Sequence, residues 1–190
     1  MTNIESKTIY FKNPGPQNTQ EALNLAKERA ETLGIKNIIV ASTTGETGAK
    51  ASQLFKNHNL VIVTHVTGFT TPNTQELTPN NRNTIKNNGA KILTTTHAFG
   101  TLGRATNKKF GTIQIDGIIS AVLRLFSQGV KVACEISCMA SDAGLIKTGE
   151  AVIAVGGTRS GADTVVVLKA SNTHSFFDLI INEIVCKPRL

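Results

Sequence analysis

The chain contains no tryptophan, one tyrosine and three cysteines among its 190 residues. No apolar run is long enough to span a bilayer, and the first residues, MTNIESKTIYF, lack the pattern of a signal peptide. We therefore expect a cytoplasmic protein without a membrane partner. The cysteines, Cys134, Cys138 and Cys186, are odd in number and show neither disulfide spacing nor a complete set of metal ligands. This predicts reduced, mostly buried thiols and no bound metal.

A dense block of basic residues is also missing, although the net charge is +7. The Lys and Arg residues are scattered, and no helix-turn-helix, zinc-finger or RNA-recognition pattern occurs, so we expect no nucleic-acid partner. Attraction of small anions to a locally positive site explains the charge more simply. With 40% hydrophobic and 17% charged residues, the composition is that of an ordinary globular protein. We assign residues 1–190 to a single domain.

Apolar strand patterns alternate with helical patterns along the chain, which predicts an α/β fold. The expected arrangement is three layers, α/β/α, around a mostly parallel sheet, with antiparallel pairing at an edge because the last strands follow short connections. Strands are predicted at 8–11, 37–41, 60–64, 91–94, 150–155, 164–168 and 183–186, and helices at 19–33, 49–56, 78–89, 112–126 and 131–143. The helix at 112–126 is expected to bury Ile115, Ile118, Ile119, Val122, Leu123 and Phe126.

Loops rich in Gly, Ser and Thr follow the predicted strands, at 42–48, 65–72, 95–104 and 156–163. In parallel sheets, ligands bind beyond the carboxyl ends of the strands. We therefore expect these loops to form one binding site.

The loop STTGETG at 42–48 joins a buried strand to a helix-forming run. Unpaired N–H groups and the positive end of the helix dipole stabilise an anion at such a place, and Gly45 and Gly48 let the backbone approach it closely. Glu46 would repel a phosphate, so it either faces outward or binds a sugar or ribityl hydroxyl. A plain strand-to-helix turn with a threonine cap is the alternative. The hydroxyl donors are Ser42, Thr43, Thr44 and Thr47.

The other loops carry candidate recognition groups. His65 and His97 each close a predicted strand, and each is either a ligand contact or only a capping side chain. Arg159, in the loop GGTRSGAD, is suited to clamp a phosphate or carboxylate, unless the loop is a mobile hairpin. The segment 67–69, Thr67-Gly68-Phe69, presents an amide and an aromatic edge to a flat ring, unless the phenylalanine only packs.

Catalytic chemistry is not visible in the sequence, because no serine elbow, Cys–His pair or carboxylate dyad stands out. Glu135 near a ligand would be an acid/base candidate. Pairing with a nearby lysine, or capping of a loop, is the favoured interpretation of this residue. We therefore assign no catalytic residue.

Two long segments resemble the C-terminal domain of pyruvate kinase, namely IIVASTTGETGAKASQLFKNHNLVIVTHV and GLIKTGEAVIAVGGTRSGADTVVVL. In pyruvate kinases the first loop binds the phosphate of a sugar-bisphosphate effector, and the second helps to close over it. The resemblance implies that Ser42, Thr43, Thr44, Gly45 and Thr47 correspond to the phosphate loop, and Arg159 and Gly161 to the closing loop. Glu46 departs from the basic or neutral residue expected there. No segment corresponds to the catalytic barrel of pyruvate kinase, so we expect no pyruvate kinase activity.

The whole chain, including SQGVKVACEISCMASDAGLI and INEIVCKPRL, is similar to a stand-alone archaeal family of this domain, some members of which bind FMN. The resemblance implies FMN as cofactor, with its phosphate on loop 42–48 and its ring towards 65–69 and 97–103. A flavin-dependent oxidoreductase is then an open option, and a sensor of phosphorylated metabolites without catalysis is the alternative. Because pyruvate kinase C-terminal domains form subunit contacts, a homo-oligomer is also implied. The expected FMN-binding residues are Ser42, Thr43, Thr44, Gly45, Glu46, Thr47, Gly48, His65, Thr67, Gly68, Phe69, His97, Gly103, Arg159 and Gly161.

Overall fold

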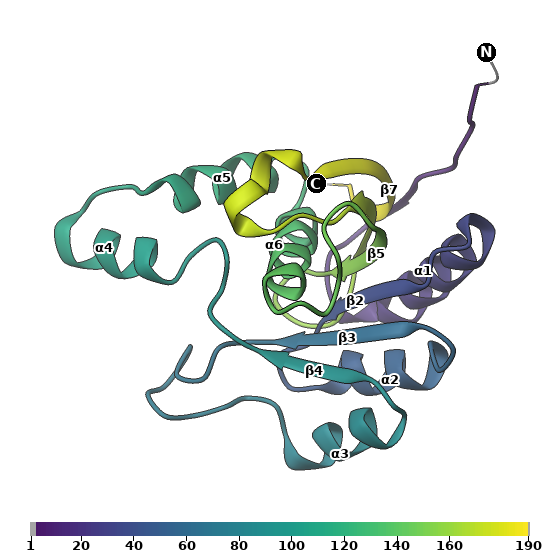
Figure 1. The fold of residues 1–190 in the computed structure, drawn as a ribbon, viewed down its shortest axis with the longest axis horizontal. Helices are drawn as coiled ribbons and strands as arrows, with labels where there is room; N and C mark the ends of the chain where they lie inside the picture. Colours follow the sequence, from purple (N-terminus) through teal and green to yellow (C-terminus); the bar gives the residue numbers. More distant parts are fainter. Residues whose placement is uncertain (1–2, 190) are drawn as a thin grey trace.

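The computed structural model describes residues 3–189, in which seven strands form one sheet (Figure 1). The strand order is β1-β7-β6-β5-β2-β3-β4. The strands are β1 Ile9–Phe11, β2 Asn37–Ala41, β3 Asn59–Thr64, β4 Lys91–Thr94, β5 Ala151–Gly156, β6 Thr164–Lys169 and β7 Ile180–Pro188.

Strand β6 runs opposite to the rest of the sheet. It pairs antiparallel with β5 and with β7, whereas the pairs β2–β5, β2–β3, β3–β4 and β1–β7 are parallel. The short loop between β5 and β6 makes a hairpin, which forces antiparallel pairing, while the parallel strands are joined by helical crossovers. The predicted α/β fold, with a mostly parallel sheet and antiparallel pairing towards one edge, is confirmed.

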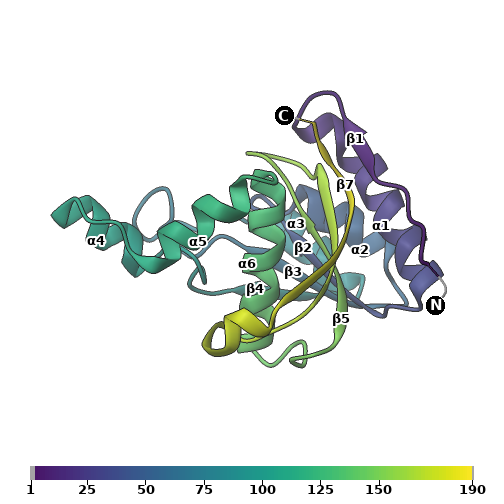
Figure 2. The ribbon, with the colours of Figure 1, turned by 90° about the horizontal axis from the view of Figure 1, so that it is seen from above.

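Helices cover both faces of the sheet and create two apolar cores (Figure 2). The helices α1, α2 and α3 pack on one face, and α6 packs on the other. This arrangement is the predicted three-layer sandwich. The helices are α1 Thr19–Leu33, α2 Glu46–Leu54, α3 Pro79–Asn87, α4 Leu102–Phe110, α5 Ile115–Arg124 and α6 Gln128–Asp142, with short 3-10 turns at Pro16–Asn18 and Thr173–Asp178. No helix in residues 3–189 is both long and apolar enough to cross a membrane.

The segment 95–126 departs from the prediction. Residues 102–104, which were expected to form the end of the loop 95–104, instead begin α4. Helices α4 and α5 extend away from the body of the molecule (Figure 2). Only one side of α5 reaches the core beneath α6, where Ile119 and Leu123 pack. The predicted burial of the other apolar residues is wrong, because no element of residues 3–189 covers that side of α5. The exposed fractions are 69% for Ile115, 48% for Ile118, 52% for Val122 and 50% for Phe126.

Capping explains where two helices begin earlier than predicted. Helix α2 starts at Glu46 because Gly45 adopts a left-handed conformation, with φ of 93°, directly before it. Helix α6 starts at Gln128, where the Ser127 hydroxyl accepts a hydrogen bond of 3.0 Å from the Val130 N–H. Both capping signals are local. The predicted starts came later because the apolar periodicity is stronger further along each helix.

Candidate functional site

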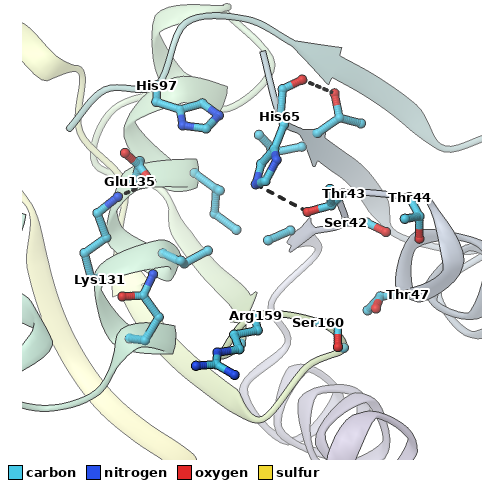
Figure 3. A pocket seen from close by; sticks show the side chains of 18 of the residues that line it. Ser42, Thr43, Thr44, Thr47, His65, His97, Lys131, Glu135, Arg159 and Ser160 are labelled. Atoms are coloured by element: carbon cyan, nitrogen blue, oxygen red, sulfur yellow. Dashed lines mark hydrogen bonds and ion pairs between the residues drawn. The ribbon is translucent and has the colours of Figure 1, made fainter. Parts of the chain in front are cut away.

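A cavity of about 580 Å³ lies at the carboxyl ends of β2, β3 and β5 (Figure 3). The loops that follow β2, β3, β4 and β5 all contribute to it, as do α6 and the first residues of α1. The predicted gathering of four loops at one edge is therefore what the structure shows. The volume is in the range of cavities that hold a cofactor-sized ligand.

The structure brings most of the predicted residues together and leaves some outside. The predicted residues that line the cavity are Ser42, Thr43, Thr44, Glu46, Thr47, His65, Phe69, His97, Arg159 and Gly161. Those that do not line it are Gly45, Gly48, Thr67, Gly68 and Gly103. Polar lining residues that were not expected are Thr19, Lys50, Thr64, Arg104, Arg124, Gln128, Lys131 and Ser160, most of them on helices without a local sequence signal.

The beginning of α2 presents free hydrogen-bond donors to the cavity. The Ser42 hydroxyl accepts a bond of 2.9 Å from the Gly48 N–H, which leaves this donor satisfied within the protein. The N–H groups of Glu46 and Thr47 have no acceptor among residues 3–189. Two free N–H groups at the positive end of a helix dipole, beside threonine hydroxyls, are donors suited to an anion.

The two loop glycines have a packing role that the sequence did not reveal. A Cβ on Gly45 would lie 2.4 Å from Leu77 Cδ1 and 2.5 Å from Asn81 Cβ. A Cβ on Gly48 would lie 2.7 Å from Ile62 Cγ2. Both glycines therefore allow α2 to approach its neighbours, and the donors to an anion come from the residues between and beside them.

Gly103 also lies away from the cavity for a packing reason. It is part of α4, where a Cβ would meet Asp116 Oδ1 at 2.0 Å. Gly103 thus permits the close approach of α4 to α5. Thr67 and Gly68 belong to an exposed turn in which the Gly68 N–H donates to the Thr74 carbonyl at 2.8 Å.

The loop between β5 and β6 is anchored. The Asp163 side chain is fully buried, and its Oδ2 accepts hydrogen bonds from the N–H groups of Gly15, at 3.0 Å, and Thr158, at 3.2 Å. The Ala162 N–H donates to the Thr19 hydroxyl at 3.0 Å. These bonds fix both ends of the loop, on either side of the exposed residues Arg159 and Ser160. Arg159, with φ of 64°, is exposed and lines the cavity (Figure 3).

His65 bridges two parts of the site. Its Nδ1 lies 2.8 Å from Glu76 Oε2, and its Nε2 lies 3.3 Å from Thr43 Oγ1. A neutral imidazole that donates from Nδ1 to the carboxylate accepts at Nε2 from the threonine hydroxyl. The Thr43 hydroxyl is thereby coupled to Glu76. Glu76 was not identified from the sequence, because it lies in a polar loop eleven residues after His65.

An aromatic cluster forms beside His65. The ring of Phe69 lies 4.2 Å from that of His65 and 5.0 Å from that of His97, and the Arg104 guanidinium lies 4.9 Å above the Phe69 ring. His97 Nε2 accepts a hydrogen bond of 3.3 Å from the Val66 N–H, which places the ring proton on Nδ1. Burial lowers the pKa of His97 and outweighs the opposing effect of Glu135. The cluster therefore offers flat ring surfaces to a ligand.

Helix α6 contributes a buried ion pair to the cavity wall. Lys131 and Glu135 are 4% and 5% exposed, and Lys131 Nζ lies 2.5 Å from Glu135 Oε2 (Figure 3). Glu135 Oε1 accepts a further bond of 3.0 Å from the Phe99 N–H. Burial lowers the pKa of Lys131, and Glu135 opposes this effect. The predicted pairing of Glu135 with a lysine is confirmed.

Positive charge predominates around the cavity. The carboxylates that line it are Glu46 and Glu135, and Glu135 is already paired. Within residues 3–189, the other cations of the lining form no ion pair, and these are Lys50, Arg104, Arg124 and Arg159. A cavity with this excess attracts anionic ligands.

Residues 20–168 of the chain match the family described as pyruvate kinase, alpha/beta domain. Two solved structures with a related arrangement are pyruvate kinases of Cryptosporidium parvum. They are 18% and 17% identical to this chain, cover 79% and 84% of it, and give TM-scores of 0.41 and 0.39. The chain spans 23% of the length of each of these pyruvate kinases. Because the family match extends over most of its residues, the chain belongs to the pyruvate kinase alpha/beta domain family.

Proposed function

We propose that this protein binds FMN, with the phosphate held at the beginning of α2. The observation that carries the proposal is the pair of free N–H groups, on Glu46 and Thr47, at the positive end of a helix that borders the cavity. The Thr44 hydroxyl and the Arg159 guanidinium, which line the same cavity, supply further donors for phosphate oxygens. The N–H groups of α2, the Thr44 hydroxyl and the Arg159 guanidinium are together the kind of donors that a phosphate monoester needs.

The remainder of the cavity suits the flavin ring. The tilted rings of His65, Phe69 and His97 offer flat contacts, and Ile136 and Met139 of α6 add an apolar wall. When bound, FMN supplies one-electron and two-electron redox chemistry. The residues of the site would bind and orient it, and none of them is assigned a catalytic role.

A second candidate function is the sensing of a phosphorylated metabolite without catalysis. The unpaired cations Lys50, Arg104 and Arg124 favour it, because they could hold a second anionic group that FMN lacks. This function also uses the beginning of α2 as its phosphate site. The two candidates therefore differ in the group that occupies the remainder of the cavity.

The absorbance spectrum of the purified protein tests the proposal. We expect flavin absorption bands, release of FMN on denaturation and recovery of binding when FMN is added back. Thr44→Val should weaken FMN binding about tenfold, since a hydrogen bond to a charged group is removed. Thr32→Val, on an exposed position of α1, is the control and should have no effect. A colourless protein that is stabilised by sugar phosphates and not by FMN would overturn the proposal in favour of the sensor.

A further inference from the structure

The Lys131–Glu135 pair is an unusual component of the cavity wall. Both side chains come from one helix and are almost fully buried, one turn apart. Removing two charges from water is expensive, and the attraction between them often does not repay the loss. Around the pair, Val132, Ile136 and Met139 of the same helix line the cavity with apolar groups. An ion pair at this place therefore does not have an obvious role in stability.

The hydrogen bonds of the pair are incomplete on the lysine side. Glu135 uses one carboxylate oxygen for Lys131 and the other for the Phe99 N–H. An ammonium group carries three N–H donors. Among residues 3–189, Lys131 has one hydrogen-bond partner, which is Glu135. Buried donors are normally satisfied, so the remaining donors of Lys131 call for an acceptor from outside the protein chain.

The surroundings decide which kind of acceptor fits. Arg104 and Arg124 line the same cavity as Lys131, and neither has a carboxylate partner within residues 3–189. The field at this part of the cavity therefore favours an oxygen that carries negative charge or a strong dipole, such as a carbonyl oxygen. A donor group of a ligand would be repelled.

We infer that Lys131 is a second anchor of the ligand and binds a carbonyl oxygen of the group that lies beyond the phosphate. The inference rests on the proposed function, and for FMN the chemical class is the carbonyl edge of the flavin ring. Glu135 is a positioning residue in this arrangement. It orients the Lys131 ammonium group, and its bond to the Phe99 N–H ties α6 to the loop that carries His97.

A cation at the carbonyl edge also affects the electronics of the flavin. Positive charge near this part of the ring favours added electron density and raises the reduction potential of the bound cofactor. Removal of the Lys131 charge should therefore lower the potential as well as the affinity. A purely structural lysine would affect neither in a protein that remains folded.

The test compares Lys131→Met/Glu135→Gln with Glu135→Gln alone. The glutamine keeps an acceptor for the Phe99 N–H, and the double substitution avoids a buried carboxylate without a partner. We expect the double variant to bind FMN about tenfold more weakly than Glu135→Gln, and its bound flavin to have a lower reduction potential. The affinity of both variants for inorganic phosphate, measured as competition with FMN, should be the same.

Equal FMN affinity and equal potential in the two variants would overturn the role of Lys131 and leave the FMN proposal standing. A wild-type protein that binds no FMN would overturn both. If the double variant does not fold, Lys131→Arg tests the position of the donors alone, because it keeps the charge and displaces the donors. It should weaken FMN binding and leave phosphate binding intact, and an unchanged FMN affinity would again contradict the inference.

Discussion

Glu76 holds the imidazole of His65, with 2.8 Å between Oε2 and Nδ1, so that Nε2 lies 3.3 Å from the Thr43 hydroxyl. The carboxylate comes from a loop before α3, and the threonine comes from the loop before α2. A bond between a carboxylate and Nδ1 fixes both the tautomer and the direction of a histidine ring. Glu76 thus supports the loop 42–48 through His65, although Glu76 itself does not line the cavity.

Glu76→Ala should weaken FMN binding about threefold to tenfold, because His65 and then Thr43 lose their fixed orientation. Glu76→Gln should restore most of the affinity, since the amide oxygen still accepts from Nδ1. The quenching of FMN fluorescence on titration with protein measures the FMN affinity of both variants. Equal affinities of the alanine and glutamine variants would show that the orientation of His65 is unimportant.

Gly45 is expected to matter for stability. Gly45→Ala should lower the free energy of unfolding by about 1–3 kcal/mol, since the residue has φ of 93° and its Cβ would collide with Leu77 and Asn81. Gly34→Ala is the matched control, because Gly34 also has positive φ but no atom within 4 Å of the Cβ position. The control should lose only about 1 kcal/mol in urea unfolding. Equal losses in the two variants would rule out the packing role of Gly45.

The three cysteines should be unreactive in the folded protein. Burial raises the pKa of Cys134, Cys138 and Cys186 to about 12, and thiolates are the reactive form. We expect no alkylation by iodoacetamide at pH 8 in the native protein and three additions in denaturant, both counted by mass spectrometry. Rapid alkylation of native protein would mean that one of these thiols is accessible.

The stability of the protein should fall on mild acidification. Burial lowers the pKa of His97 below its ordinary value of 6.5, so the unfolded chain binds more protons than the folded protein as the pH falls through that value. The contribution of the neutral His97 to the free energy of unfolding is complete above pH 6.5 and decreases below it. His97→Gln should flatten part of the dependence between pH 7.5 and 5.5, and His58, whose pKa burial also lowers, should account for another part. His174→Gln, at an exposed position, is the control and should not flatten it.

The exposed side of α5 should tolerate charge. Ile118→Lys and Val122→Lys should change the free energy of unfolding by no more than about 0.5 kcal/mol, because both side chains are about half exposed. Ile136→Ala, in α6, should cost about 2–5 kcal/mol because this residue is 4% exposed. Urea unfolding measures all three. If the wild type forms an assembly that the lysine variants lose, a second copy of the chain covers this side of α5.

Elements with a strong local signal were predicted closely. The strands Asn37–Ala41 and Lys91–Thr94 and the helix Thr19–Leu33 have the expected bounds, because an apolar run or a long 3.6-residue period determines each of them. The prediction for 112–126 was wrong in its burial. The period of α5 shows which side chains share a side of the helix, but burial depends on whether another element covers that side.

The pattern of apolar and polar residues was enough to identify the alternation of strands and helices, and with it the segments that meet at one edge of the sheet. It also placed Ser42–Thr47, His65, His97 and Arg159 just beyond the strand ends, because each follows a recognisable strand. The contributions of Lys131 and Glu135 to the cavity, and of Glu76 to the orientation of His65, depend on the tertiary structure. These residues meet the loops through packing between segments distant in sequence, and no local pattern of side chains records such contacts.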